Sequence, residues 1–211
     1  MLSRYTAQFL CAALLAVATQ QANAEADPKN QWRIGLGVMD LHYNVGEAAE
    51  VWPDHQPAVE IGWTRQLSGP WSVRANFLHA PSKHRQTHQI VSMDHTEDND
   101  NSAKYSLFQV GVGYTLTEAH WGKLTVFGML THARATFQFT EIETIGGTTR
   151  PPRKGEGQIN KNRLMLGLEY QLPGIDTLGG ALPYVQVQSL ISSSALGGNH
   201  TVVSAGLVKS F

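Results

Sequence analysis

Apolar and polar residues alternate in eight segments of the chain. In the first of them, WRIGLGVMDLHY, Ile34 and Leu36 share one face while Arg33 lies on the other. A period of two is typical of a β-strand whose two faces meet different surroundings. We therefore predict an all-β chain with eight strands, at residues 32–43, 58–67, 71–79, 105–116, 123–133, 163–172, 183–191 and 202–211.

The fifth segment, KLTVFGMLTHA, is the least regular of the eight, because both of its faces are rather apolar. Its alternation could continue through RATFQFTEI at residues 134–142 or stop before it. If the strand continues, Phe137 and Phe139 belong to a rigid hairpin that rises beyond the other strands. The pattern alone leaves both alternatives open.

The connections between these segments alternate in length. Long polar stretches follow the odd-numbered segments, at 44–56, 82–104, 138–159 and 192–200. Shorter links follow the even-numbered ones, at 68–70, 117–122 and 173–182. Long loops at one end and short turns at the other are typical of an up-and-down meander that closes into a transmembrane barrel.

Alternation fits two architectures, which differ in where the apolar face points. In a soluble two-sheet sandwich it points into the core, whereas in a membrane barrel it points outward to lipid. The even strand number and aromatic residues near the strand ends favour the barrel, as does the closure that a sheet needs in lipid. These aromatic residues are Trp32, Trp63, Trp71, Tyr114, Trp121 and Tyr170. The predicted fold is an eight-stranded antiparallel up-and-down transmembrane β-barrel.

The first 24 residues have the features of a cleaved secretory signal. They begin with a basic residue at Arg4, continue with an apolar run, and end with small residues before a predicted cleavage after Ala24. The apolar run is shorter than the roughly 20 residues that a membrane-spanning helix needs. Cleavage would remove Cys11, the only cysteine, so the mature chain would hold no disulfide. Residues 25–211 then form one barrel domain.

The charge of the chain is close to balanced, with 16 Lys and Arg residues against 17 Asp and Glu residues. An exported chain without a basic excess has no evident nucleic-acid partner. No motif indicates a cofactor, and a monomer is expected. The predicted location is the outer membrane of a Gram-negative bacterium.

Three stretches resemble a known group of proteins. The terminal GLVKSF resembles the C-terminal signature of Gram-negative outer-membrane barrels, although Lys209 stands where an apolar residue is usual. PAVEIGWTRQLSGPWSVRANF and FQVGVGYTL resemble hairpins of the small OmpA-like, OmpX/Ail and opacity-protein barrels. The resemblance implies that Phe211 is a signal for the outer-membrane assembly machinery, and that lipid and lipopolysaccharide surround the chain.

Charged residues also occur on the face predicted to point inward. An eight-stranded barrel has an interior just wide enough to be filled by side chains. We therefore expect a network of paired charges in place of an apolar core; a narrow polar pore is the alternative. The residues of this interior network are Arg33, Glu60, Arg74 and Glu169.

Histidine and carboxylate residues gather in the second long polar stretch, HAPSKHRQTHQIVSMDHTEDNDN. Imidazole and carboxylate groups are ligands that Zn²⁺ accepts. The predicted metal ligands are His84, His88, Asp94 and His95. Their spacing matches no rigid motif, so a solvated loop without metal is the alternative.

Basic residues gather in the third long stretch, TTRPPRKGEGQINKNR, where two prolines favour an extended chain. Arginine binds phosphate and sulfate groups with two parallel hydrogen bonds. The stretch is therefore a candidate site for lipopolysaccharide or for a host or surface polyanion; a solvated loop without a ligand is the alternative. Its predicted ligands are Arg150, Arg153, Lys154 and Lys161.

The sequence offers little for catalysis. Some small barrels act on lipid A, and a deacylase needs serine, histidine and a carboxylate within hydrogen-bond reach. No His-x-Ser motif is present, and His200 and Ser204 would lie about 13 Å apart on one strand. We expect no enzyme. The predicted role is structural or adhesive, carried by the long loops; a narrow solute channel and a lipid A-modifying enzyme are the alternatives.

Overall fold

The computed structural model describes residues 30–41, 55–173, 180–191 and 200–211. The predicted signal peptide, most of the first and fourth long stretches and part of the 173–182 link lie outside these residues. In the described residues, no helix is long and apolar enough to cross a membrane. The strands are β1 (Asn30–Leu41), β2 (His55–Gln66), β3 (Trp71–Ser92), β4 (His95–Ala119), β5 (Gly122–Ile145), β6 (Thr148–Thr149), β7 (Arg153–Gln171), β8 (Leu182–Leu190) and β9 (His200–Ser210).

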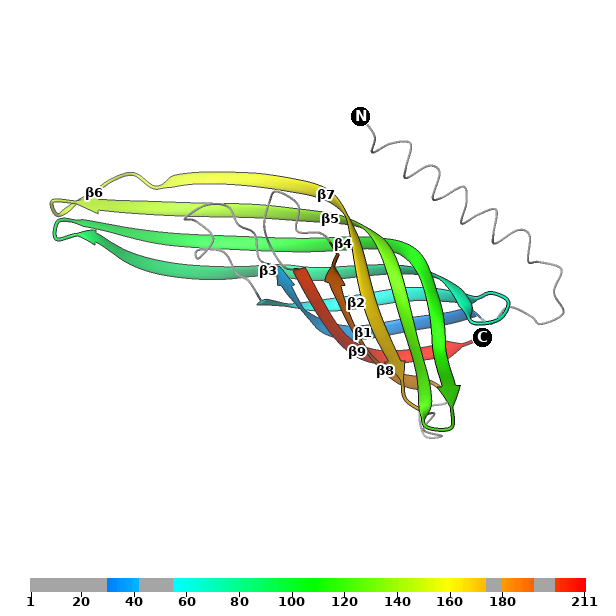
Figure 1. Ribbon diagram of the computed structural model, residues 1–211. Coiled ribbons are helices and arrows are strands. Elements are labelled where there is room, and N and C mark those ends of the chain that lie inside the picture. The colour runs from blue at the N-terminus through cyan, green and yellow to red at the C-terminus, as the bar shows by residue number, and fades with distance from the viewer. Residues whose placement is uncertain (1–29, 42–54, 174–179, 192–199) are drawn as a thin grey trace, which may run out of the picture.

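Eight of these strands form one closed ring, in which every pairing is antiparallel (Figure 1). Neighbours in sequence pair with each other, except that β5 pairs with both the two-residue β6 and β7. The ring closes where β1 pairs with β9, from Gln31 opposite Ser210 to Leu41 opposite His200. The predicted eight-stranded antiparallel barrel is confirmed.

The two faces of the barrel wall carry opposite chemistry. Polar residues that point inward are almost fully buried, among them Arg33, Glu60, Thr64, Arg74, Asn76, Gln109, Glu169 and Gln186. Apolar residues that point outward are exposed, among them Ile34, Leu36, Val38, Val59, Ile61, Phe108, Val110, Leu164, Leu166, Leu168, Val185, Val187 and Val203. A globular protein in water would do the reverse. The wall is therefore that of a barrel that spans a membrane.

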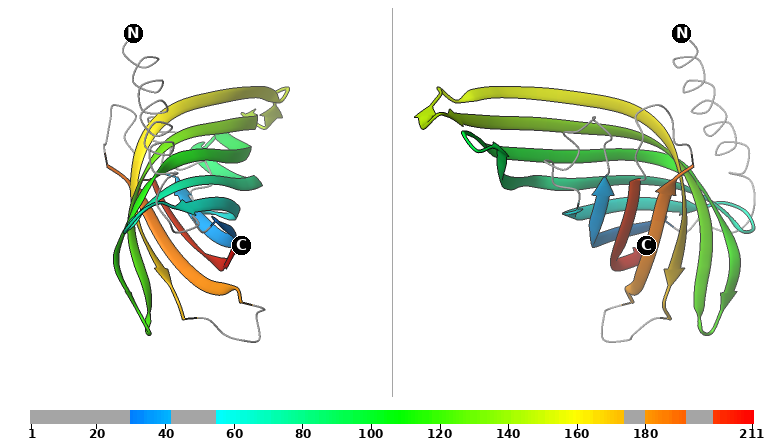
Figure 2. Two further views of the ribbon diagram at one scale, coloured as in Figure 1. Left: turned by 90° about the vertical axis from the view of Figure 1, so that its right-hand side faces the viewer. Right: turned by 60° about the vertical axis from the view of Figure 1, so that its left-hand side comes forward.

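Four strands continue well beyond the others. β3, β4, β5 and β7 rise together from one side of the barrel as a four-stranded sheet, here called the extension (residues 81–104 and 134–163; Figures 1 and 2). The prediction of loops at 82–104 and 138–159 was therefore wrong, because most residues of both stretches belong to paired strands. The open question about the fifth segment is also answered, since β5 runs through Phe137 and Phe139 to Ile145.

The extension lacks the alternation that marks the barrel strands for a physical reason. Above the membrane neither face meets lipid, so both faces can be polar while the backbone remains paired. Cross-strand partners such as Thr87 with Asn99 and Asp100 with Thr140 show this. In the extension, contacts between side chains on neighbouring strands specify the pairing, because no single apolar face does so.

A β-bulge marks the place where β3 enters the extension. The register moves from Ala80 opposite Tyr105 to Lys83 opposite Ala103, so three steps on β3 match two on β4. Pro81 lies inside this irregularity, where a residue without an N–H group is tolerated. β3 therefore continues through Pro81 to Ser92.

Candidate functional site

A network of buried charges lies in the lower half of the barrel interior, the half next to the short turns. The upper half is the one next to the extension. The carboxylate of Glu169 lies between two guanidinium groups, with Arg33 Nη1 at 2.5 Å from Oε2 and Arg74 Nη2 bonded to the same oxygen. Gln171 Nε2 donates to the other oxygen at 2.7 Å. All of these side chains are nearly inaccessible to solvent. One acidic group on β7 thus pairs with two cations on β1 and β3, across the barrel interior.

Glu60, the second interior acid, has neutral partners. Gln186 Nε2 donates to its carboxylate at 2.6 Å, Ser204 Oγ at 2.5 Å and Tyr184 Oη at 3.2 Å. Gln186 also accepts a hydrogen bond from Arg33 at 3.3 Å, which links Glu60 to the arginine pair. The structure thus places all four predicted interior residues in one connected network.

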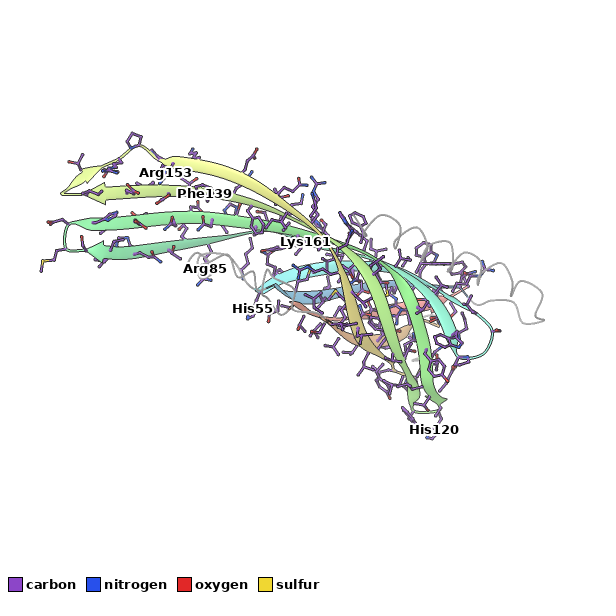
Figure 3. All side chains as sticks on the ribbon, turned by 45° about the horizontal axis from the view of Figure 1, so that its top comes forward. His55, Arg85, His120, Phe139, Arg153 and Lys161 are labelled. Carbon is purple, nitrogen blue, oxygen red and sulfur yellow. The ribbon has the colours of Figure 1, made fainter. Side chains whose placement is uncertain are left out.

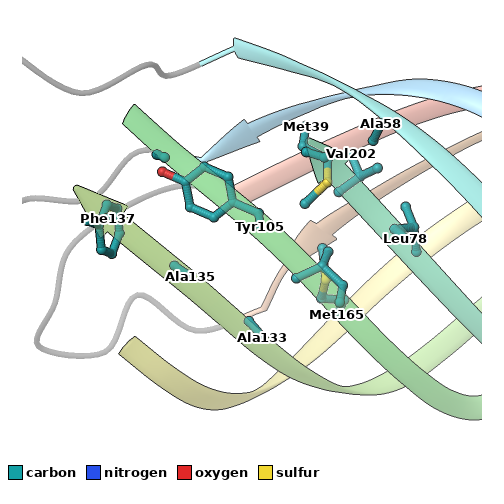
Figure 4. Packing of buried hydrophobic residues seen from close by; sticks show 12 residues of the cluster. Met39, Ala58, Leu78, Tyr105, Ala133, Ala135, Phe137, Met165 and Val202 are labelled. Carbon is teal, nitrogen blue, oxygen red and sulfur yellow. The ribbon is translucent and has the colours of Figure 1, made fainter. Parts of the chain in front are cut away.

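An apolar cluster lies in the upper half of the interior, which the sequence analysis did not predict. Figure 4 shows Met39, Leu78, Tyr105, Met165 and Val202 gathered between the strands. The complete cluster is Met39, Ala58, Leu78, Ala80, Ala103, Tyr105, Leu107, Ala133, Ala135, Phe137, Met165 and Val202. The interior is therefore not polar throughout: the upper half combines this cluster with buried amides such as Gln56, which donates to the carbonyl of Ala103 at 3.1 Å. Side chains fill the barrel at both levels, which leaves little room for a solute pathway.

Aromatic residues pair across strands at the end of the barrel that carries the short turns. Trp71 contacts Tyr114 edge to face at 4.9 Å between ring centroids, and Trp32 stacks on Phe211 at 6.3 Å. The backbone N–H of Phe211 also donates to the carbonyl of Asn30 at 3.0 Å. Phe211 thus bridges the seam between β1 and β9, at a height where aromatic side chains favour the membrane interface.

We predict that Phe211→Ser lowers the yield of inserted barrel several-fold, because the seam loses its stacking partner and its interfacial anchor. The measurement is the fraction of chain in the outer membrane that resists unfolding in cold detergent on a gel. Phe139→Ser is the matched control, since it removes a partly exposed ring from the extension. Equal yields of the two variants would contradict a role for Phe211 in assembly.

The predicted polyanion ligands do not converge. Arg150 pairs with Glu143 at 3.0 Å and Arg153 with Glu141 at 3.7 Å. Lys154 lies on the opposite face of β7 from Arg153, because neighbours on a strand point to opposite sides. Figure 3 shows Arg153 far out on the extension and Lys161 where the extension leaves the barrel, eight residues or about 26 Å apart.

A pair of cations that the sequence analysis missed lies on the outward face. Ser106 is opposite Arg134 and Lys104 is opposite Thr136, so Lys104 and Arg134 are diagonal neighbours on β4 and β5. Both are exposed, and Arg134 Nη2 bonds only the neutral Gln158, at 3.0 Å. Among the described residues neither cation has an acidic partner. Only the register between the strands reveals this pair.

Two of the predicted metal ligands lie on the outward face of the extension. His84 Nδ1 lies 3.6 Å from Asp100 and His88 Nδ1 lies 2.6 Å from Asp98, and all four side chains are largely exposed. Each histidine faces one carboxylate across the β3–β4 pair. Neither group holds three ligands.

The other two predicted metal ligands lie elsewhere. His95 is on the opposite face of the sheet, with Nε2 at 3.3 Å from Glu97 Oε1. Asp94 is in the turn before β4, and its backbone carbonyl accepts a hydrogen bond from Gly146 at 2.8 Å. The predicted set of four is therefore divided between two faces and a turn, because a strand separates even from odd positions.

A histidine and a serine meet at the upper edge of the apolar band, the ring of exposed apolar residues on the outside of the barrel wall. His79 Nδ1 and Ser106 Oγ are 3.0 Å apart, in register on β3 and β4, and the His79 ring stacks on Phe77. A search for His-x-Ser within one strand could not find such a pair. No carboxylate bonds His79 within the described residues, so the third member of a hydrolytic triad is missing there.

No family model and no curated protein matches the chain. Among solved structures, the attachment invasion locus protein Ail of Yersinia pestis is similar, with 12% identity, a TM-score of 0.54, and coverage of 88% of this chain and 100% of Ail. A second Ail structure, in complex with the heparin analogue sucrose octasulfate, gives 13% identity, a TM-score of 0.52 and the same coverage. The crystal structure of Neisserial surface protein A gives 10% identity and a TM-score of 0.43, with 86% of this chain and 97% of that protein covered. The chain therefore has the fold of Ail, a small membrane-spanning β-barrel.

Proposed function

We propose that the chain is an outer-membrane barrel whose extension binds polyanions at the cell surface. The observation that carries the proposal is the extension itself, in which four strands continue above the apolar band as a paired sheet. In barrels of this kind the short turns face the periplasm and the long segments face outward. The extension therefore presents a fixed surface to the surroundings of the cell.

The interior supports this function over that of a channel. Arg74, Tyr105, Phe127, Met129 and Tyr184 are among the largest fully buried side chains. They occupy the space that a solute would need. A lipid A-modifying enzyme has less support, because His79 and Ser106 lack an orienting carboxylate in the described part of the chain.

Two lines of support point to a polyanion as the partner. The similar protein Ail has been solved with a heparin analogue, so this fold can present sulfate-binding groups. In the present chain, Lys104 and Arg134 form the adjacent cation pair that no acid neutralises among the described residues. Lys104 lies four residues beyond Phe108, an exposed apolar residue on the same face of β4, so we propose that the pair meets the outer-leaflet phosphates of lipopolysaccharide. Phosphate or sulfate groups suit such a pair.

The test uses the full chain refolded into uncharged lipid nanodiscs. Lys104→Ser with Arg134→Ser should weaken binding to immobilised heparin and to lipopolysaccharide vesicles about 10-fold or more, because two charge-assisted hydrogen bonds are lost. The matched control is Arg150→Ser with Arg153→Ser, which removes the same charge from the same extension. We expect less than about a 3-fold change there, since Glu143 and Glu141 already neutralise these arginines.

The two double variants separate three outcomes. Weaker binding in the Lys104→Ser, Arg134→Ser variant alone supports the proposed site. A preference for lipopolysaccharide over heparin would identify the membrane as the source of the anion. Weaker binding in the Arg150→Ser, Arg153→Ser variant alone would support the sequence-based prediction, which also included Lys154 and Lys161. Equal losses would mean that net charge, and not a site, governs binding.

A further inference from the structure

Three potential metal ligands meet near the tip of the extension. One ligand atom from each of His95, Glu97 and Glu143 can be chosen so that all three lie within 4.8 Å of one another. All three residues are only partly exposed. From this geometry we infer a Zn²⁺ site that joins the β3–β4 hairpin to the β5–β6 hairpin.

The pairing of the strands fixes the three residues. Glu97 and Glu143 are direct cross-strand partners on β4 and β5, and His95 lies two residues before Glu97 on the same face. The two turns are also tied together, since Gly146 N donates to the carbonyl of Asp94 at 2.8 Å. Ligands on paired strands are better positioned than ligands on a loop.

The tight β5–β6 turn contributes to this arrangement. Its two central residues, Gly146 and Gly147, have φ values of 56° and 76°. This left-handed region favours glycine, and two such residues in succession are typical of a two-residue hairpin loop. The turn aligns Thr144 with Thr149 and so brings Arg150 back toward Glu143.

The electrostatics of the site favour a cation. Two carboxylates directly opposite each other on neighbouring strands repel, and Arg150 compensates only the charge of Glu143. Arg150 bonds only Oε2 of Glu143, so a second oxygen is available for a metal. His95 Nε2 is shielded from solvent and makes no hydrogen bond. Its nearest charged atom is Glu97 Oε1 at 3.3 Å, which belongs to another proposed ligand of the same metal.

Coordination needs only small movements of these side chains. Zn–N and Zn–O bonds of about 2.0–2.2 Å place tetrahedral ligands about 3.4 Å apart, so each pair of atoms closes by at most about 1.4 Å. One histidine and two carboxylates suit Zn²⁺, with water in the fourth position. Ca²⁺ prefers six to eight oxygen ligands and is disfavoured here.

The test is isothermal titration of ZnCl₂ into the full chain without an affinity tag, in nanodiscs. One Zn²⁺ per chain should bind, and His95→Gln or Glu97→Gln should weaken binding at least 10-fold. An equal concentration of Ca²⁺ should not displace the metal. His88→Gln is the matched control, because His88 also faces a carboxylate but on the other side of the sheet, and binding should persist.

Hydrogen exchange gives a second measurement that does not depend on titration heats. Zn²⁺ should slow exchange at residues 94–97 and 143–146 in the unaltered chain and in His88→Gln, but not in Glu97→Gln. Absence of binding, unchanged binding in both ligand variants, or equal losses in His95→Gln and His88→Gln would each overturn the site. The site does not depend on polyanion binding, so either proposal can fail alone.

Discussion

Replacing Glu169 with glutamine should lower the free energy of unfolding by about 3–5 kcal/mol, because two buried cations lose their counter-charge. Arg33 and Arg74 both bond this carboxylate, and all three side chains are buried. Glutamine keeps the size of the side chain but offers only a neutral oxygen. The measurement is urea unfolding of the barrel in lipid vesicles, followed by tryptophan fluorescence.

Glu60→Gln is the matched control for this prediction. Its carboxylate accepts hydrogen bonds from Gln186, Ser204 and Tyr184, so the substitution removes no direct ion pair. The expected loss is about 1–3 kcal/mol. If the two variants unfold at the same urea concentration, the arginine pair is not held by Glu169 in the way described.

Gly167→Ala should be almost as damaging, because the barrel interior has no space for a methyl group at this position. A Cβ atom there would overlap the ring of Phe127 and lie 2.6 Å from the carbonyl oxygen of Val187. The ring could turn only within a filled interior, and the carbonyl belongs to the neighbouring strand. Overpacking of this kind costs about 1–3 kcal/mol, and the backbone contact places this case at the upper end. The measurement is the same urea unfolding.

Gly128→Ala tests whether the stability loss in Gly167→Ala comes from steric overlap or from replacing a glycine in a strand. Gly128 is opposite Leu166, next to the Phe127–Gly167 pair, but it points outward. A Cβ atom there would meet only a Leu166 methyl group at 3.5 Å, an ordinary contact. We expect a change within about 0.5 kcal/mol. A large loss in this variant would argue against the steric explanation.

The barrel could be predicted from the sequence because lipid imposes a strict pattern. Every second residue of a spanning strand must be apolar, as in Ile34, Leu36 and Val38, and this requirement stands out in the sequence. The upper interior was missed because Met39, Leu78 and Met165 occupy the face that is polar elsewhere. In the sequence, each of them is a single apolar residue on a polar face. Only the pairing of the strands shows that they form one cluster.

The extension could not be predicted in the same way. Residues such as His88 and Asp98 face water, so nothing in their polarity distinguishes a paired strand from a loop. The same limit applies to the candidate sites. Lys104 meets Arg134, and Glu97 meets Glu143, only through the register of β4 with β5. Alternation determines the face on which a residue lies but not its neighbour on the next strand.

The seam between β1 and β9 has a consequence for the order of folding. Gln31 and Ser210 are hydrogen-bonded there at 3.2 Å and are 179 residues apart in sequence. The other barrel pairings join barrel strands that follow one another along the chain. Hairpins can therefore form early, and the seam must close last. Until then the sheet has two unpaired edges that can join a second chain. We therefore expect slow closure of the seam to appear as aggregation.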